Sequence, residues 1–199
     1  MHGTFFDIGL GLGLAIACGV RPYLPALLVG ALASSSALGV SFDAAHFRFL
    51  SSSWWLLAVA IVLAASYLTQ LRLGSERFDG VASGSVTAQA IAVGALLFAG
   101  TLAAHGETWW PGLLGGAAAA LLSRAAVVPV VAGARARLAD RSAREALTLY
   151  VDAASLALAA LVALLHPLGY VAAALFAWLL WRVRARAETK YAGLRIMRR

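Results

Sequence analysis

The chain has few charged residues and a single cysteine, and both shortages restrict what it can be. Only 13% of its 199 residues are charged, whereas 62% are hydrophobic. A soluble domain carries about 25% charged and about 45–50% apolar residues. Cys18 is the only cysteine, which excludes an intrachain disulfide and a cysteine metal cluster. We interpret Cys18 as a small buried apolar residue.

The motifs of common chemistry are also missing. The sequence contains no glycine-rich phosphate loop, no nucleophile elbow and no zincin pattern. His46, His105 and Glu107 do not have the spacing of metal ligands. We therefore expect no enzyme activity, no cofactor and no metal. The first 20 residues contain no Lys or Arg, so a removable signal peptide is not expected.

Long apolar runs are what the sequence does contain, and its mean hydropathy is +0.83. A membrane-spanning helix needs about 20 apolar residues, and about six such stretches are present. They are predicted at Phe5–Leu38, Trp54–Leu71, Val86–Ala104, Pro111–Gly133, Leu147–His166 and from the Pro167–Gly169 turn to Trp181, with a polar loop at Leu71–Ser85. The prediction is an all-α polytopic integral membrane bundle, a single domain over residues 1–199.

Basic residues gather at the ends of these runs. Thirteen of the 16 Lys and Arg residues fall in three stretches. These are Arg72 and Arg77, the four arginines of Arg135–Arg144, and the seven basic residues of Arg182–Arg199. The positive-inside bias predicts that all three lie in the cytoplasm. We expect a multi-pass protein of the inner cell membrane with a cytoplasmic C-terminus, and no nucleic-acid partner.

An arginine followed by a proline occurs twice inside apolar sequence. Arg21 precedes Pro22, and Arg124, which lies 103 residues later, precedes Pro129. A buried charge and a helix break in matching places of two halves indicate a midplane binding site in a transporter built from repeats. We therefore predict two inverted halves, 1–104 and 105–181, followed by a basic tail, 182–199.

The first apolar run is too long for one straight helix across the bilayer. Its 34 residues would span roughly 50 Å, against a hydrocarbon core of about 30 Å. Gly19, Pro22 and Pro25 predict a break there, and Pro129 predicts a distortion near residues 124–129. The run either crosses once, with the N-terminus inside, or turns back as a hairpin, with the N-terminus outside. The repeat favours the single broken crossing.

The predicted substrate site follows from the two arginines. Arg21 and Arg124 would bind an anionic solute or lipid head group. The other predicted site residues are Pro22, Tyr23, Pro25, Ser66, Gln70 and Asp152. In the alternative, the arginines snorkel or pair with Asp7 or Asp152 and only lock the bundle. Asp152 either carries protons or forms an ion pair with Arg144 or Arg124.

Two functions remain open from the sequence. The first is a small transporter or channel with an arginine-lined site between the halves. The second is a non-catalytic membrane scaffold or accessory subunit whose arginines are structural. The lipid bilayer is the expected partner in both cases, and homo-oligomerisation is left open.

Two stretches of the sequence resemble a known family. The first runs from Gly11 to Gly30 and contains Gly-Val-Arg-Pro-Tyr-Leu-Pro, and the second is Phe49-Leu-Ser-Ser-Ser-Trp-Trp-Leu-Leu. They resemble the bacterial membrane family called domain of unknown function 4126, and the likeness extends over nearly the whole chain. The resemblance implies a multi-pass topology and no established activity. Relatives often have acidic residues near Ser66, Gln70 and Val151, which this chain lacks. The arginine–proline elements are also similar, at the level of fold, to DedA-type lipid-phosphate translocases.

Overall fold

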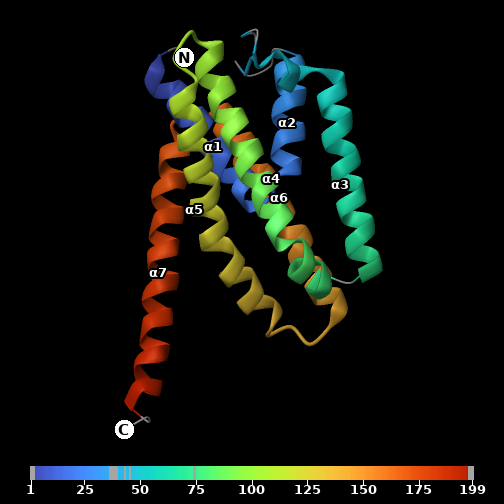
Figure 1. Ribbon diagram of the computed structural model, residues 1–199, viewed down its shortest axis with the longest axis vertical. Helices are drawn as coiled ribbons and strands as arrows, with labels where there is room; N and C mark the ends of the chain where they lie inside the picture. Colours follow the sequence, from blue (N-terminus) through green and yellow to red (C-terminus); the bar gives the residue numbers. More distant parts are fainter. Residues whose placement is uncertain (1–2, 36–39, 43, 45, 74, 197–199) are drawn as a thin grey trace.

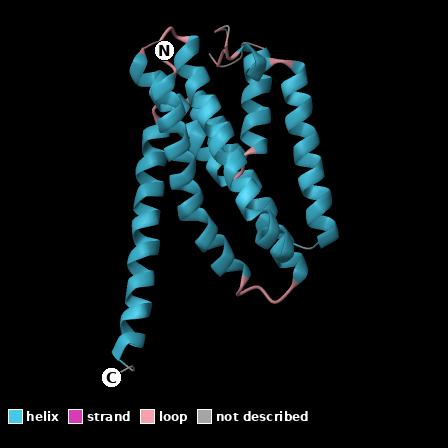
Figure 2. Ribbon diagram, in the orientation of Figure 1, coloured by secondary structure: helices cyan, strands magenta, loops and turns pink. Residues whose placement is uncertain are grey.

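The computed structural model describes residues 3–35, 40–42, 44, 46–73 and 75–196, and this part of the chain folds into helices joined by short loops (Figure 2). The elements are α1 (Thr4–Val20), α2 (Tyr23–Ser34), the 3-10 helix η2 (Arg48–Ser51), α3 (Ser53–Leu73), α4 (Ser75–Ala104), α5 (Trp110–Arg135), α6 (Arg141–Leu164) and α7 (Leu168–Ile196). The predicted all-α class is confirmed.

Five helices, α3 to α7, are long and apolar enough to cross a membrane. With their apolar outer faces, they make the chain a multi-pass membrane protein. The other two are shorter, because α1 has 17 residues and α2 has 12. At 1.5 Å per residue they reach about 26 Å and about 18 Å, less than the roughly 30 Å of a hydrocarbon core.

The first apolar run turns back instead of crossing. α1 descends from the upper end of the bundle in Figure 1, and α2 returns to the same end. Thr4 at the start of α1 donates a hydrogen bond to Glu107 in the α4–α5 loop, and Gly30 near the end of α2 lies against Leu50 in η2. The favoured single crossing is therefore wrong, and residues 4–34 form a re-entrant hairpin.

α1 lies at the centre of the bundle, where it contacts α4, α5, α6 and α7. Most of its residues from Gly9 to Gly19 are buried, since a helix covered on all sides is apolar all round. Glycines allow α1 and its neighbouring helices to approach one another closely. A side chain at Gly19 would collide with Ala120 and Ser123 of α5, and one at Gly169 would collide with the backbone of Gly9.

Two boundaries differ from the sequence prediction. The expected polar loop at residues 71–85 is wrong, because α3 runs to Leu73 and α4 begins at Ser75. The basic tail continues α7 as far as Ile196. A helix satisfies its own backbone hydrogen bonds, so it can extend beyond the apolar part of its sequence.

The second arginine–proline element does not interrupt its helix. α5 is continuous from Trp110 to Arg135 with Pro129 inside it, although its lower part slants away from the line of its upper part in Figure 1. Proline removes one backbone donor and can bend a helix without ending it. The backbone therefore turns back at Arg21 and continues through Arg124.

Candidate functional site

The tip of the re-entrant hairpin holds Arg21 in extended backbone, with φ −147° and ψ 118°. Its N–H still donates to the carbonyl of Ala17 and closes α1. Pro22 follows as the N-cap of α2, and Pro25 lies in the first turn of that helix. Both prolines occupy positions where a backbone N–H would lack an intrahelical partner, so they end one helix and start the next without lost bonds. The predicted break at residues 19–25 is confirmed.

Arg21 lies at mid-depth in the bundle. Its Nε atom is 2.7 Å from Oδ1 of Asp152, which lies halfway along α6. The hydroxyl of Tyr67 on α3 donates to the other carboxylate oxygen of Asp152. The side chain of Asp152 is only 7% exposed, and a buried carboxylate needs such partners. Three segments of the chain therefore meet at this carboxylate.

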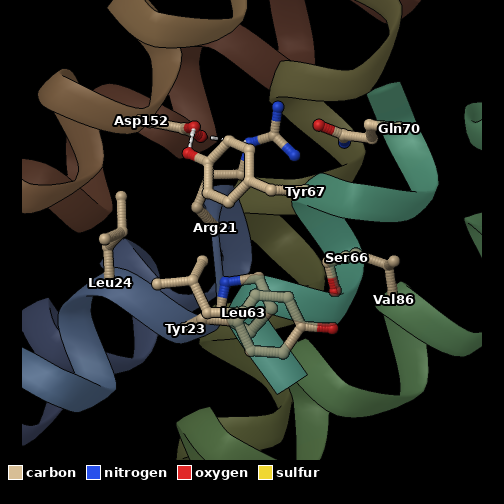
Figure 3. A pocket seen from close by; sticks show the side chains of 10 residues that line it. Arg21, Tyr23, Leu24, Leu63, Ser66, Tyr67, Gln70, Val86 and Asp152 are labelled. Carbon is tan, nitrogen blue, oxygen red and sulfur yellow. Dashed lines mark hydrogen bonds and ion pairs between the residues drawn. The ribbon is translucent and has the colours of Figure 1, made fainter. Parts of the chain in front are cut away.

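The outer end of the Arg21 guanidinium contacts no partner in the part of the chain that the structure describes. A guanidinium has five N–H donors, and Asp152, through Nε, is the only hydrogen-bond or ion-pair partner of this side chain among the described residues. The side chain is 20% exposed. In Figure 3 its terminal nitrogens point away from Asp152, on the side where the Gln70 amide lies. A planar fork of donors is therefore open at this position.

A small cavity lies beside this fork (Figure 3). Its volume is about 20 Å³, enough for about one water molecule. Its walls come from the hairpin tip, α3, α4 and α6. The lining residues are Arg21, Pro22, Tyr23, Leu24, Leu63, Ser66, Tyr67, Gln70, Val86 and Asp152.

A second group of polar contacts adjoins the cavity on the α4 side. The Tyr23 hydroxyl donates to the side-chain oxygen of Gln89 on α4. Arg124 on α5 donates from Nε to the Thr87 hydroxyl over 2.6 Å. The guanidiniums of Arg21 and Arg124 are near enough for their charges to interact. The guanidiniums of Arg21 and Arg124 thus lie in the same region as the buried carboxylate of Asp152.

The structure brings together most of the predicted site residues. Arg21, Pro22, Tyr23, Ser66, Gln70 and Asp152 all line the cavity. Arg124 lies next to it, whereas Pro25 is buried in α2 away from the lining. Asp152 pairs with Arg21, which is one of the pairings that the alternative with structural arginines allowed, and not with Arg144 or Arg124.

Tyr67, Gln89 and Thr87 were not predicted. Helical spacing was an available signal for the first of them. Leu63, Ser66, Tyr67 and Gln70 fall on one face of α3, and two of these four were already singled out.

Asp7 lies in a separate polar group at the upper end of the bundle. It is buried, and its Oδ1 is 3.4 Å from Nδ1 of His105. Asp7 therefore does not pair with either arginine at the predicted site. Burial lowers the pKa of the nearby His166, in the loop between α6 and α7, and the Asp7 carboxylate opposes this shift. The residues that the structure describes contain no cluster of three metal-ligating side chains.

Comparison with known proteins identifies the family of this chain, but the family has no described activity. No curated protein and no solved structure matches the chain. Residues 8–186 match the family described as Domain of unknown function (DUF4126). The match includes the hairpin, the cavity and all five spanning helices, in agreement with the sequence resemblance. This membrane protein belongs to the DUF4126 family.

Proposed function

We propose that the chain is a small membrane transporter that binds an anionic solute or lipid head group at Arg21. One observation carries the proposal. At mid-depth of a spanning bundle, the outer donors of an arginine face a cavity and have no partner among the described residues. A charge at this depth is expensive and is usually functional. Unwound backbone at this depth is tolerated where it is buried or lines a cavity, as it does at Arg21.

The electrostatics around the cavity favour an anion. Arg21 lines the cavity and Arg124 lies on its α4 side, so both bring positive charge to it, while Asp152 pairs with Arg21. The N-terminus of α2 starts at Tyr23, and a helix N-terminus adds a partial positive charge. A phosphate or carboxylate could take two parallel hydrogen bonds from the guanidinium fork, whereas a cation would be repelled.

Asp152 acts as the resident counter-ion in this proposal. The cavity has room for about one water molecule, and a phosphate or carboxylate group is larger. The cavity therefore has to widen before a substrate anion can enter, and Asp152 neutralises Arg21 until it does. Substrate and Asp152 would then share the guanidinium, with the substrate on its outer edge.

The scaffold function is the second candidate, and a specific observation favours it. Arg21 and Asp152 already form a close ion pair beside a small cavity. A purely structural arginine would look similar at its Nε side. A purely structural role would not explain why the outer donors of Arg21 face the cavity. Because transport of an anion explains those donors, it is the preferred proposal. We propose no catalytic role.

Thermal stability of the purified protein tests the proposal. The parent chain, Arg21→Gln and Arg21→Lys are melted in detergent with and without phosphate, sulfate, dicarboxylates and anionic lipids. We expect at least one anion to raise the melting temperature of the parent, no effect on Arg21→Gln, and a weak effect on Arg21→Lys because an ammonium lacks the fork. Arg141→Gln, at a highly exposed position, is the matched control. If Arg21→Gln unfolds outright and no anion stabilises the parent, the arginine is structural and the scaffold function holds.

The proposed orientation puts the C-terminus in the cytoplasm of a bacterial cell, with the chain in the inner membrane. The α3–α4 junction, the α5–α6 loop and the end of α7 all lie at the lower end in Figure 1. These are the three basic stretches, which the positive-inside bias assigns to the cytoplasm. A fluorescent reporter that matures only in the cytoplasm should light up at the C-terminus. Activity of a periplasmic reporter at that position would reverse the orientation.

A further inference from the structure

The wall of the cavity formed by α3 is the least anchored part of the bundle. Within its membrane span only 6% of the residues are buried, against 50% for α4 and 33% for α6. α3 lies at the periphery of the bundle (Figure 1), where its main neighbours are α2, η2 and α4. Its outer face is apolar, with Leu57, Ile61 and Leu68 exposed. In a membrane, lipid tails cover that face.

The inner face of α3 changes character along its length. Trp55, Leu56 and Val59, in the upper half, are apolar, and Leu56 packs against Gly30 of α2. Ser66, Tyr67 and Gln70, in the lower half, line the cavity. The upper half is thus held by packing, while the lower half lines the cavity.

A single polar link holds the lower half. Among the α3 side chains that the structure describes, only Tyr67 hydrogen-bonds to another helix, through Asp152. Ser66 and Thr69 bond to carbonyls of α3 itself. A head group can enter only if one wall moves, because the cavity has room for about one water molecule. The wall with the fewest buried residues and one polar link can move at the lowest cost.

We infer that the lower half of α3 is a lateral gate, and that the ligand of the Arg21 site is an anionic amphiphile that enters from the bilayer. The inference rests on the proposed function and names its substrate class. Movement of α3 away from the hairpin tip opens the cavity towards hydrocarbon. A phosphate or carboxylate head group then reaches the Arg21 fork, while its chains stay among the lipids. A soluble anion has no acyl chains that could stay among the lipids, so entry from the bilayer would not favour its binding.

Four probes separate the amphiphile from its head group. The full chain is melted in nanodiscs of neutral lipid with dioleoylphosphatidic acid, dioleoylglycerol, glycerol 3-phosphate or inorganic phosphate. We expect the phosphatidic acid alone to raise the melting temperature, and Arg21→Gln to lose the rise. The basic end of α7 could also attract anionic lipid, so a variant with Arg182→Gln and Arg184→Gln is included, and it should keep most of the rise.

A matched pair on α3 tests the location of the ligand. Leu63→Trp fills the cavity from the inner face, whereas Leu68→Trp makes the same change on the exposed outer face. The first should lose at least half of the lipid-induced rise and the second should keep it. If Leu63→Trp fails to fold, Ser66→Phe fills the same space without removing a bond between helices.

The outcomes distinguish the two proposals. If glycerol 3-phosphate or inorganic phosphate stabilises the parent as much as phosphatidic acid, and Arg21→Gln removes the effect, the anion site stands and the lateral gate falls. An unchanged lipid-induced rise in both cavity-filling variants would also overturn the gate. If no anionic probe stabilises the parent, the proposed transporter site fails together with the inference.

Discussion

The ion pair between Arg21 and Asp152 should couple the hairpin tip to α6 strongly enough to measure. Removing one partner of a buried ion pair typically costs about 3–5 kcal/mol, because the other charge is left uncompensated. Arg21 is partly exposed and Asp152 keeps Tyr67 as a second partner, so we expect the low end, about 3 kcal/mol, for both Arg21→Gln and Asp152→Asn. The double variant leaves no unpaired charge. It should therefore cost about 1–3 kcal/mol less than the sum of the single variants.

The assay is the free energy of unfolding in micelles, followed by tryptophan fluorescence for the parent, the two single variants and the double variant. Arg141 and Glu145 supply the control cycle, because their charged atoms are 2.9 Å apart but their side chains are 77% and 56% exposed. Exposed pairs of this kind contribute about 0.3–0.5 kcal/mol. Additive losses at Arg21 and Asp152, within about 0.5 kcal/mol, would refute the claim that the pair holds the hairpin tip in place.

Three further predictions use the same protein. Tyr67→Phe should lower the free energy of unfolding by about 1.5 kcal/mol through the lost hydrogen bond to a charged acceptor; an unchanged value would mean that this bond does not hold α3. Gly169→Ala should cost about 1–3 kcal/mol because its methyl group collides with the backbone of Gly9. Gly133→Ala, where the added carbon meets no atom, should leave the free energy of unfolding unchanged or raise it by up to about 1 kcal/mol. Equal effects of Gly169→Ala and Gly133→Ala would contradict the close contact between α1 and α7. The lowered pKa of His166 means that the unfolded chain binds its proton first as pH falls through about 6.5. The melting temperature should therefore drop more between pH 7 and pH 5 in the parent than in His166→Gln, and parallel curves would exclude the role of His166.

Much of the site was predictable because it depends on residues that are costly in a membrane. Arg21 and Asp152 stood out as charges in apolar sequence, and Pro22 indicated the break between α1 and α2. The partner of Arg21 could have been chosen by distance alone. Asp7 lies 14 residues earlier on the same helix, which is about 21 Å along its axis. That length excludes the Asp7 pairing and leaves Asp152.

The direction of the chain after the break was not predictable from the same residues. A proline ends a helix but does not decide whether the next helix continues or turns back. That choice depends on packing, since α6 contacts both α1 and α2 and gives both arms of the hairpin an apolar neighbour. The likeness between the two arginine–proline elements favoured a single broken crossing instead of a hairpin. It was misleading because Arg21 stands directly before its proline, while Arg124 stands five residues before Pro129. Proline disfavours helical backbone at the residue directly before it, which is Arg21 in the first element and Val128 in the second.

The donors of Arg21 give the strongest reason to regard this arginine as more than structural. A scaffold that needed only to lock α1 to α6 would be served by the contact between Nε of Arg21 and Asp152. The other donors of Arg21 have no partner among the described residues. Donors of a charged group that stay unpaired at this depth are costly, and an anion bound to them would relieve that cost. This relief is the physical basis of the anion site that we propose at Arg21.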